Sequence, residues 1–157
     1  MAADASIHAS AVLIGAKAVL IRGASGSGKS QLAWALIQAA QNAPAGTLPF
    51  ARLVGDDRVH VEASGGSLLV RPAPALAGLI EIRGLGIRRL PHEAVAVIGL
   101  VVDLAATDAA RFPAEETAAT AISGVGLPRL AVAPGQDALA LVLAWLGTAA
   151  APGPAAD

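Results

Sequence analysis

The stretch that decides the fold is Gly23-Ala24-Ser25-Gly26-Ser27-Gly28-Lys29-Ser30, which fits the phosphate-loop pattern G-x-x-x-x-G-K-[ST]. It follows an apolar run at 18–22 and precedes apolar residues at helical spacing, so it joins a strand to a helix. Glycines let backbone N–H groups turn toward phosphate oxygens, and the helix adds the positive end of its dipole. Lys29 can then reach the β- and γ-phosphates, and the Ser30 hydroxyl can ligate Mg²⁺. The pattern predicts that residues 23–30 bind ATP; the alternative is a glycine-rich turn without a ligand.

The neighbouring sequence predicts a domain with many short strands and few helices. Strands are expected at 11–14 and 18–22, joined by a turn at 15–17, and a helix at 29–41, followed by a surface loop at 42–49. Further strands are expected at 52–55, 59–62, 67–71, 79–82, 94–104 and 130–133, with a short helix within 105–120 and a closing helix at 136–146 capped by Gly147. This order favours an α/β fold with a mixed β-sheet in one domain, 1–147, and a disordered tail, 148–157.

Composition narrows the class of protein. The 157 residues carry a formal net charge of −1, which lacks the basic footprint of a nucleic-acid-binding protein. There is no cysteine, so disulfides and thiolate metal sites are excluded and a cytoplasmic location is expected. Hydrophobic residues make up 55% of the chain, yet in its longest charge-free stretch only 138–146 is strongly apolar, too short to span a bilayer. No signal peptide and no membrane contact are expected.

An acidic pair and a second glycine loop are the other candidate functional features. Asp56 and Asp57 follow the apolar residues Leu53 and Val54, and carboxylates at the end of a strand are well placed over a ligand crevice. One could hold Mg²⁺ while the other faces a phosphate acceptor; the alternative is a solvated acidic turn. Within residues 80–87, Glu81 and Arg83 stand among isoleucines, just before Gly84. Glu81 could contact a metal and Arg83 a phosphate; the alternative is a surface ion pair beside a glycine turn. His8, just before the first strand, is by itself a structural or exposed residue.

Three segments in this order, 23–30, 53–59 and 81–87, resemble the catalytic domain of HPr kinase/phosphorylase, and the resemblance runs from about residue 8 to 146. It implies a P-loop fold similar to phosphoenolpyruvate carboxykinase. It also implies an ATP-dependent and Mg²⁺-dependent transferase that phosphorylates a serine of an HPr-like phosphocarrier protein, in regulation of the phosphotransferase system. Members of the family also remove that phosphate with inorganic phosphate as acceptor. They assemble as homo-oligomers, and whether ATP or pyrophosphate is the preferred donor stays open.

The resemblance also implies roles for single residues. Asp56 matches the catalytic aspartate, which takes the serine proton in the forward direction and returns it in reverse. Asp57 and Glu81 match positions near the metal, together with Ser30. Three more residues are assigned to catalysis. His8 is expected near the reacting phosphate, Arg83 matches the arginine of the family's signature, and Lys29 is the lysine of the phosphate loop.

Several departures from the larger enzymes bear on activity. The chain resembles short forms without the family's N-terminal domain, and it has Gln31 where the family often has an acidic residue. Ala133 and Gln136 stand where the larger enzymes carry arginines, which favours the kinase direction over phosphorolysis. Two other functions remain as alternatives: a P-loop kinase of a small metabolite, and a nucleotide-binding regulatory module without catalysis.

Overall fold

The computed structural model describes residues 5–45 and 48–151 of the 157-residue chain. The elements, in chain order, are β1 (Ala5–Ile7), β2 (Ala9–Ile14), β3 (Lys17–Arg22), α1 (Lys29–Asn42), β4 (Ala51–Gly55), β5 (Val59–Ser64), β6 (Ser67–Pro72), a 3₁₀ turn (Pro74–Leu76), β7 (Leu79–Ile82), β8 (Gly86–Arg89), β9 (Ala96–Asp103), β10 (Ala119–Ile122), β11 (Val125–Ala131) and α2 (Ala138–Gly147).

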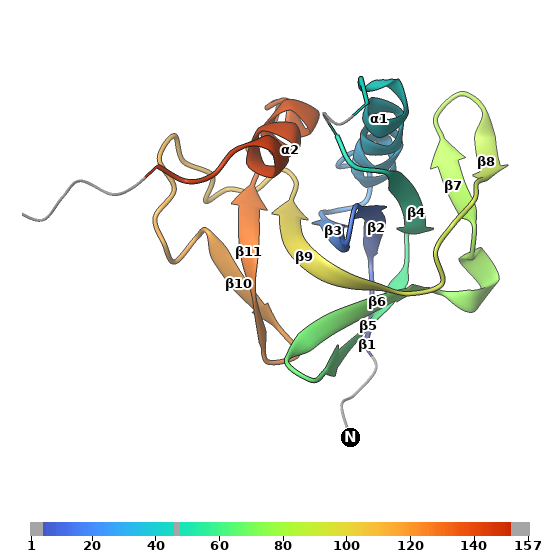
Figure 1. Cartoon of the computed structure of the whole chain (residues 1–157), viewed down its shortest axis with the longest axis horizontal. Helices are drawn as coiled ribbons and strands as arrows, with labels where there is room; N and C mark the ends of the chain where they lie inside the picture. The colour runs from blue at the N-terminus through green and yellow to red at the C-terminus, as the bar shows by residue number, and fades with distance from the viewer. Residues whose placement is uncertain (1–4, 46–47, 152–157) are drawn as a thin grey trace, which may run out of the picture.

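Strand β9 is the centre of a mixed nine-stranded sheet (Figure 1). One edge of β9 pairs in parallel with β3, which continues through antiparallel partners to β2 and β4. Its other strand neighbours are β6, which leads to β5 and β1, and the parallel strand β11, which pairs with β10. The valine-rich run at 94–104 was expected to form a long central strand, and this prediction is confirmed.

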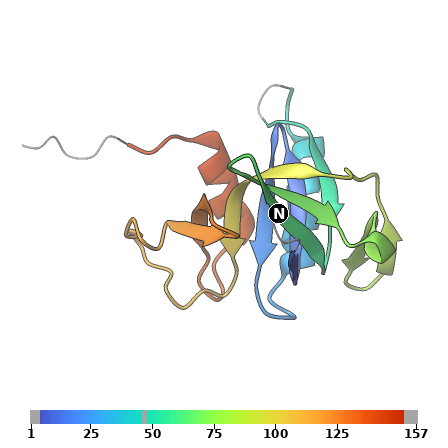
Figure 2. The same cartoon turned by 90° about the horizontal axis from the view of Figure 1, so that it is seen from below.

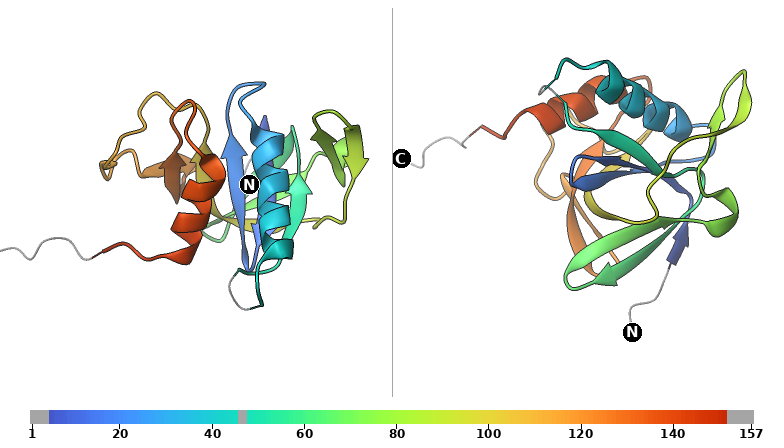
Figure 3. Two further views of the ribbon diagram at one scale, coloured as in Figure 1. Left: turned by 90° about the horizontal axis from the view of Figure 1, so that it is seen from above. Right: turned by 45° about the vertical axis from the view of Figure 1, so that its right-hand side comes forward.

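The sheet buries a hydrophobic cluster on each face. Along β3, Val19 and Ile21 belong to the cluster under the helices, while Ala18 and Leu20 belong to the opposite cluster, as the two-residue period of a strand requires. Helices α1 and α2 lie beside each other over the first face, and β5 and β6 cross beneath the second (Figures 2 and 3). This packing holds the phosphate-loop strand from both sides.

The expected fold class is confirmed: the domain is α/β with a mixed sheet, and the described residues contain two α-helices. The β2–β3 and β5–β6 hairpins and the helix after the phosphate loop also form where the sequence predicts them, within one or two residues. None of the described helices is long and apolar enough to cross a membrane.

The short helix expected within 105–120 is wrong. Residues 105–118 form turns and bends, and β10 follows them. The alanines of this stretch favour a helix locally, but Pro113 interrupts it and Ala105 adopts a left-handed φ of 52°. Instead of closing helical bonds, the carbonyl of Thr117 accepts a hydrogen bond from Arg129 on β11.

Other boundaries differ from those expected. Strand β11 begins at Val125, because it pairs with β10 before it reaches β9, and it ends at Ala131. Helix α2 starts after its N-cap Asp137, and Gly147 is its last residue instead of its cap. Strands β1, β8 and β10 were not expected, and β8 is exposed throughout and so lacks an alternating burial pattern. Residues 148–151 have no regular structure, and the rest of the expected tail, 152–157, lies outside the described residues.

Candidate active site

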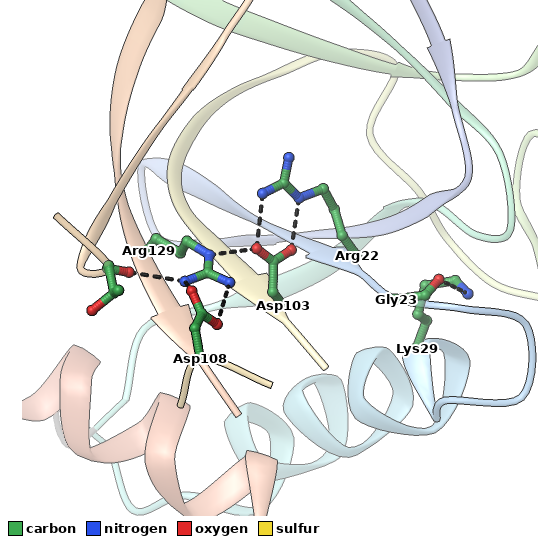
Figure 4. Close-up of polar contacts among 7 residues, drawn as sticks. Arg22, Gly23, Lys29, Asp103, Asp108 and Arg129 are labelled. Carbon is green, nitrogen blue, oxygen red and sulfur yellow. Dashed lines mark hydrogen bonds and ion pairs between the residues drawn. The ribbon is translucent and has the colours of Figure 1, made fainter. Parts of the chain in front are cut away.

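The phosphate loop has the backbone conformation that its glycines permit. Gly26 and Gly28 have φ values of 83° and 101°, in the left-handed region that favours glycine. A Cβ atom at Gly26 would meet no neighbouring atom within 4 Å, so the loop is open at this point. The Lys29 side chain is buried, and its Nζ donates hydrogen bonds to the carbonyls of Gly23 (2.8 Å) and Ala24 (3.1 Å), as Figure 4 shows for Gly23.

Helix α1 points its N-terminus at this loop. The helix begins at Lys29, and its N-cap, Gly28, supplies no side-chain hydrogen bond. The amide N–H groups of the first helical turn have no partner within a helix, and they carry the positive end of the helix dipole. The loop and the helix together therefore present N–H donors and one ammonium group to an anion.

A cleft of about 240 Å³ brings most of the predicted site residues together, but not Gly23, Ala24, Ser27, Asp56 or His8. Its lining, which defines the loop cleft, consists of Ser25, Gly26, Gly28, Lys29, Ser30, Gln31, Asp57, Glu81 and Arg83. Asp57 follows β4 and has a left-handed φ of 68°, whereas Glu81 lies on β7 and Arg83 in the turn after it. Three segments far apart in the sequence thus meet at the phosphate loop, as expected. Glu81 and Arg83 line one cleft although β7 ends between them.

Asp56 is buried, with 4% of its surface exposed, and it lies behind Ser30, which lines the loop cleft. Its carboxylate accepts hydrogen bonds from the hydroxyls of Ser10 (2.5 Å) and Ser30 (2.8 Å) and from the backbone N–H of Glu81 (3.2 Å). A carboxylate offers about four lone-pair positions. These three donors leave room for about one more hydrogen bond, such as one from a hydroxyl group that is to receive a phosphate.

A second cleft of about 200 Å³ reaches Asp56. This Asp56 cleft is lined by Ser30, Asp56, Asp57, Leu76, Leu79, Ile80, Glu81 and Ile87. Ser30, Asp57 and Glu81 line both clefts, so they form a polar wall between them. Another groove of about 260 Å³, between α1 and β4, contains none of the predicted site residues.

The residues of this wall fit a nucleotide phosphate with Mg²⁺. Mg²⁺ is usually bound through one or two carboxylates together with phosphate oxygens and water. The wall offers two carboxylates and a hydroxyl whose proton is given to Asp56, which leaves the Ser30 oxygen free to ligate a cation. Nowhere in 5–45 or 48–151 do three His, Cys, Asp or Glu side chains form a metal-binding group.

His8 is placed differently from the other predicted residues. It lies at the same end of the sheet as the phosphate loop, because the next residue, Ala9, pairs with Arg22. However, its side chain is exposed and lines neither cleft. Its Nε2 lies 2.9 Å from Nη2 of Arg58, and since an arginine only donates, this ring nitrogen accepts.

An ion-pair network fixes the strand ends beside the phosphate loop (Figure 4). Asp103, at the end of β9, accepts two hydrogen bonds from Arg22, the residue before Gly23, at 2.7 and 2.8 Å. Arg129 on β11 donates to the same carboxylate and, through both terminal nitrogens, to Asp108. The parallel strands β3, β9 and β11 are therefore joined at their carboxyl ends, where the loop begins.

The network predicts an acid-sensitive contribution to stability. Burial raises the pKa of Asp103, but hydrogen bonds and charge from Arg22 and Arg129 outweigh it and hold this pKa below its usual value. The folded state then binds fewer protons than the unfolded state, so the stabilisation is complete above the unfolded pKa, about 3.9, and is lost as pH falls through the folded value. We expect Asp103→Asn to lower the free energy of unfolding at pH 7 by about 1.5–3 kcal/mol and to flatten its pH dependence below pH 4.

Urea unfolding of wild type and variant across this pH range measures both effects. Glu115→Gln, at an exposed acidic residue, is the control and should match wild type. Parallel pH curves for wild type and Asp103→Asn would contradict the role given to this carboxylate.

Three contributors to the site were not among the expected residues. Ser10 is fully buried against Asp56, and a polar residue on the same side of β2 as Val12 and Ile14 was the signal available. Arg58 holds His8 and also donates to Ser6, but its neighbours in sequence suggest only a solvated turn. Asp103 gives no local signal, because its partners lie on two other strands.

Comparisons with known proteins agree on one family. Residues 1–142 match the family described as HPr Serine kinase C-terminal domain. The HPr kinase/phosphorylase of Streptococcus thermophilus is 42% identical over 88 residues, and that of Exiguobacterium sibiricum is 39% identical over 88 residues; each match covers 55% of this chain. The chain spans about a quarter of these relatives (25%). The structure of the Hpr(Ser) kinase/phosphatase from Coxiella burnetii shares the fold, with a TM-score of 0.70 at 22% identity over 90% of this chain and 93% of that chain.

Proposed function

This chain belongs to the family of HPr serine kinase C-terminal domains, and on that premise we propose that it transfers the γ-phosphate of ATP to a serine of an HPr-like phosphocarrier protein. The names of the relatives, HPr kinase/phosphorylase, support this assignment. The domain would act in the cytoplasm, in regulation of a phosphotransferase system, as part of a homo-oligomer.

One observation carries the proposal: the loop cleft and the Asp56 cleft share a polar wall. The loop cleft, with Lys29 and the phosphate-loop backbone, suits the donor phosphates. The Asp56 cleft is mostly apolar beyond its carboxylates, so it suits a side chain presented by another protein. Phosphoryl transfer needs such positioning and charge neutralisation more than covalent catalysis.

The residues divide the work of an in-line transfer. Asp56 accepts the proton of the serine hydroxyl while the serine oxygen bonds to the γ-phosphorus and the bond from that phosphorus to the β-phosphate oxygen breaks. Lys29 and Arg83 offset the negative charge of the phosphates. Mg²⁺, when bound, supplies further neutralisation, and Ser30, Asp57 and Glu81 are its proposed ligands. His8, held by Arg58 at the same end of the sheet, completes the proposed catalytic set.

In the reverse direction, inorganic phosphate would displace the serine and Asp56 would return the proton. The loop at 133–136 has no cationic side chain for inorganic phosphate, and its Ala133 N–H already donates to the Gln136 side chain at 3.0 Å. The kinase direction is therefore the main activity that we propose, with phosphorolysis slower.

The test is transfer of labelled γ-phosphate from ATP, with Mg²⁺, to a purified HPr-family carrier. A carrier whose target serine is replaced by alanine serves as the control. We expect label on the first carrier alone, and loss of that label on adding excess inorganic phosphate more slowly than it formed. Binding of ATP without any label on the carrier would favour the regulatory module, and label on small metabolites alone would favour a metabolite kinase.

A further inference from the structure

A third cleft, of about 310 Å³, adjoins the phosphate loop on its other side. Gly28 and Gln31 line both this cleft and the loop cleft, so the two meet at the start of α1. The remaining walls come from α1, from the ends of β9 and β11 with the loops that follow them, and from the first turn of α2. The ends of two helices and two strands therefore surround one cavity beside the loop.

Charge separates the two clefts. The loop cleft contains Lys29, Asp57, Glu81 and Arg83, whereas no lining residue of the third cleft carries a charge. We call it the uncharged cleft. Phosphates need cations or N–H donors when they leave water, so they belong in the loop cleft, and the uncharged cleft suits a neutral group.

The position of the uncharged cleft follows from the sheet. Ligands of open α/β sheets bind at the carboxyl ends of parallel strands. Here β3, β9 and β11 are parallel, and the cleft includes Leu104 and Val132, which come directly after β9 and β11. Asp56 lies on the opposite side of β3, beyond β2. A donor whose terminal phosphate faces Asp56 thus extends its other end toward the uncharged cleft.

We propose that the uncharged cleft binds the nucleoside of the phosphate donor, so that this domain prefers a nucleoside triphosphate to pyrophosphate. This inference rests on the proposed kinase function. The cleft volume is at the lower end of the roughly 300–1,000 Å³ of small-molecule pockets, enough for a nucleoside. Two amide side chains supply hydrogen bonds: Gln31 makes none with any described residue, and Gln136 uses its carbonyl oxygen on Ala133 but keeps its NH₂ group free.

The test fills the cleft from two walls and measures binding by calorimetry. Ala138→Phe on α2 and Ala35→Phe on α1 each place a ring in the cavity, while Ala140→Phe, at an exposed position of α2 outside the cleft, is the matched control. The ligands are ADP and pyrophosphate, each with Mg²⁺. We expect the dissociation constant of ADP to rise at least about tenfold in both cleft variants. The pyrophosphate constant should stay within about twofold, and the control should match wild type.

Because the two variants fill the cleft from different helices, the experiment remains decisive if one of them does not fold. Equal weakening of ADP and pyrophosphate, or no change for either, in a folded cleft variant would overturn the assignment. Wild-type protein that binds pyrophosphate as tightly as ADP would overturn the nucleoside inference and leave the kinase proposal standing. Wild-type protein that binds neither ligand would overturn both.

Discussion

Lys29→Ala is expected to weaken ATP binding by at least about a hundredfold and to abolish transfer to the carrier. The Lys29 ammonium is the cation of the phosphate loop, and its hydrogen bonds to the carbonyls of Gly23 and Ala24 hold it against the first two residues of the loop. A hydrogen bond to a charged group contributes about 1.5–3 kcal/mol, and 2.7 kcal/mol corresponds to a hundredfold change in affinity. Calorimetric titration with ATP and Mg²⁺, beside the label-transfer assay, measures both losses.

The chain provides its own control for this experiment. Lys17 is its other lysine, and it is exposed at the opposite end of the same strand, β3. Lys17→Ala removes the same charge without touching the loop, so it should bind and turn over ATP as wild type does. Unchanged turnover in Lys29→Ala would sink the proposal that residues 23–30 hold the donor phosphates.

Asp56→Asn is expected to leave ATP affinity near wild type and to lower the transfer rate by a factor on the order of hundreds or more. Asparagine keeps the shape of the side chain but cannot take up the serine proton. The loop cleft does not include Asp56, so the donor phosphates should bind normally. Single-turnover transfer with saturating ATP separates the chemical step from binding, and a melting curve checks that the buried site stays folded.

Asp57→Asn is the matched comparison, because it makes the same chemical change one residue away. Asp57 is exposed and lines both clefts, and we propose that it binds Mg²⁺. This variant should need more Mg²⁺ for half-maximal transfer and recover rate at high Mg²⁺, whereas Asp56→Asn should not recover. If Asp56→Asn transfers phosphate at the wild-type rate, Asp56 is not the base.

The parts of the site that the sequence predicted share a local origin. The phosphate loop follows from the spacing of its glycines, Lys29 and Ser30 within eight residues. The acidic pair could be assigned because it directly follows an apolar strand. Both predictions depend on a local condition alone: the strand before each motif must end where its run of apolar residues ends. The structure then places Asp57, Glu81 and Arg83 beside the loop, on segments that the sequence had singled out.

Other features of the fold and the site had no local signal in the sequence, or a misleading one. The alanines at 105–120 favoured a helix, yet the segment is held as a loop by Arg129, a residue on another strand. Ser10 looks like an ordinary strand serine until β2 and β4 pair and bring Asp56 onto it. The expected place of His8 near the reacting phosphate stays a prediction: the structure sets it beside Arg58, at the same end of the sheet as the phosphate loop but outside both clefts.

By itself, then, the sequence determined the family, the phosphate loop and the strand and helix pattern around it, because hydrophobic period, glycine placement and motif spacing act over a few neighbouring residues. Only the tertiary structure decided which carboxylate is buried, which strand ends are tied together and where a cavity without charge lies. Those features depend on pairs such as Arg22 with Asp103, 81 residues apart, and Ser10 with Asp56, 46 residues apart. Such pairs come together only when the parallel and antiparallel strands of the mixed sheet take their places.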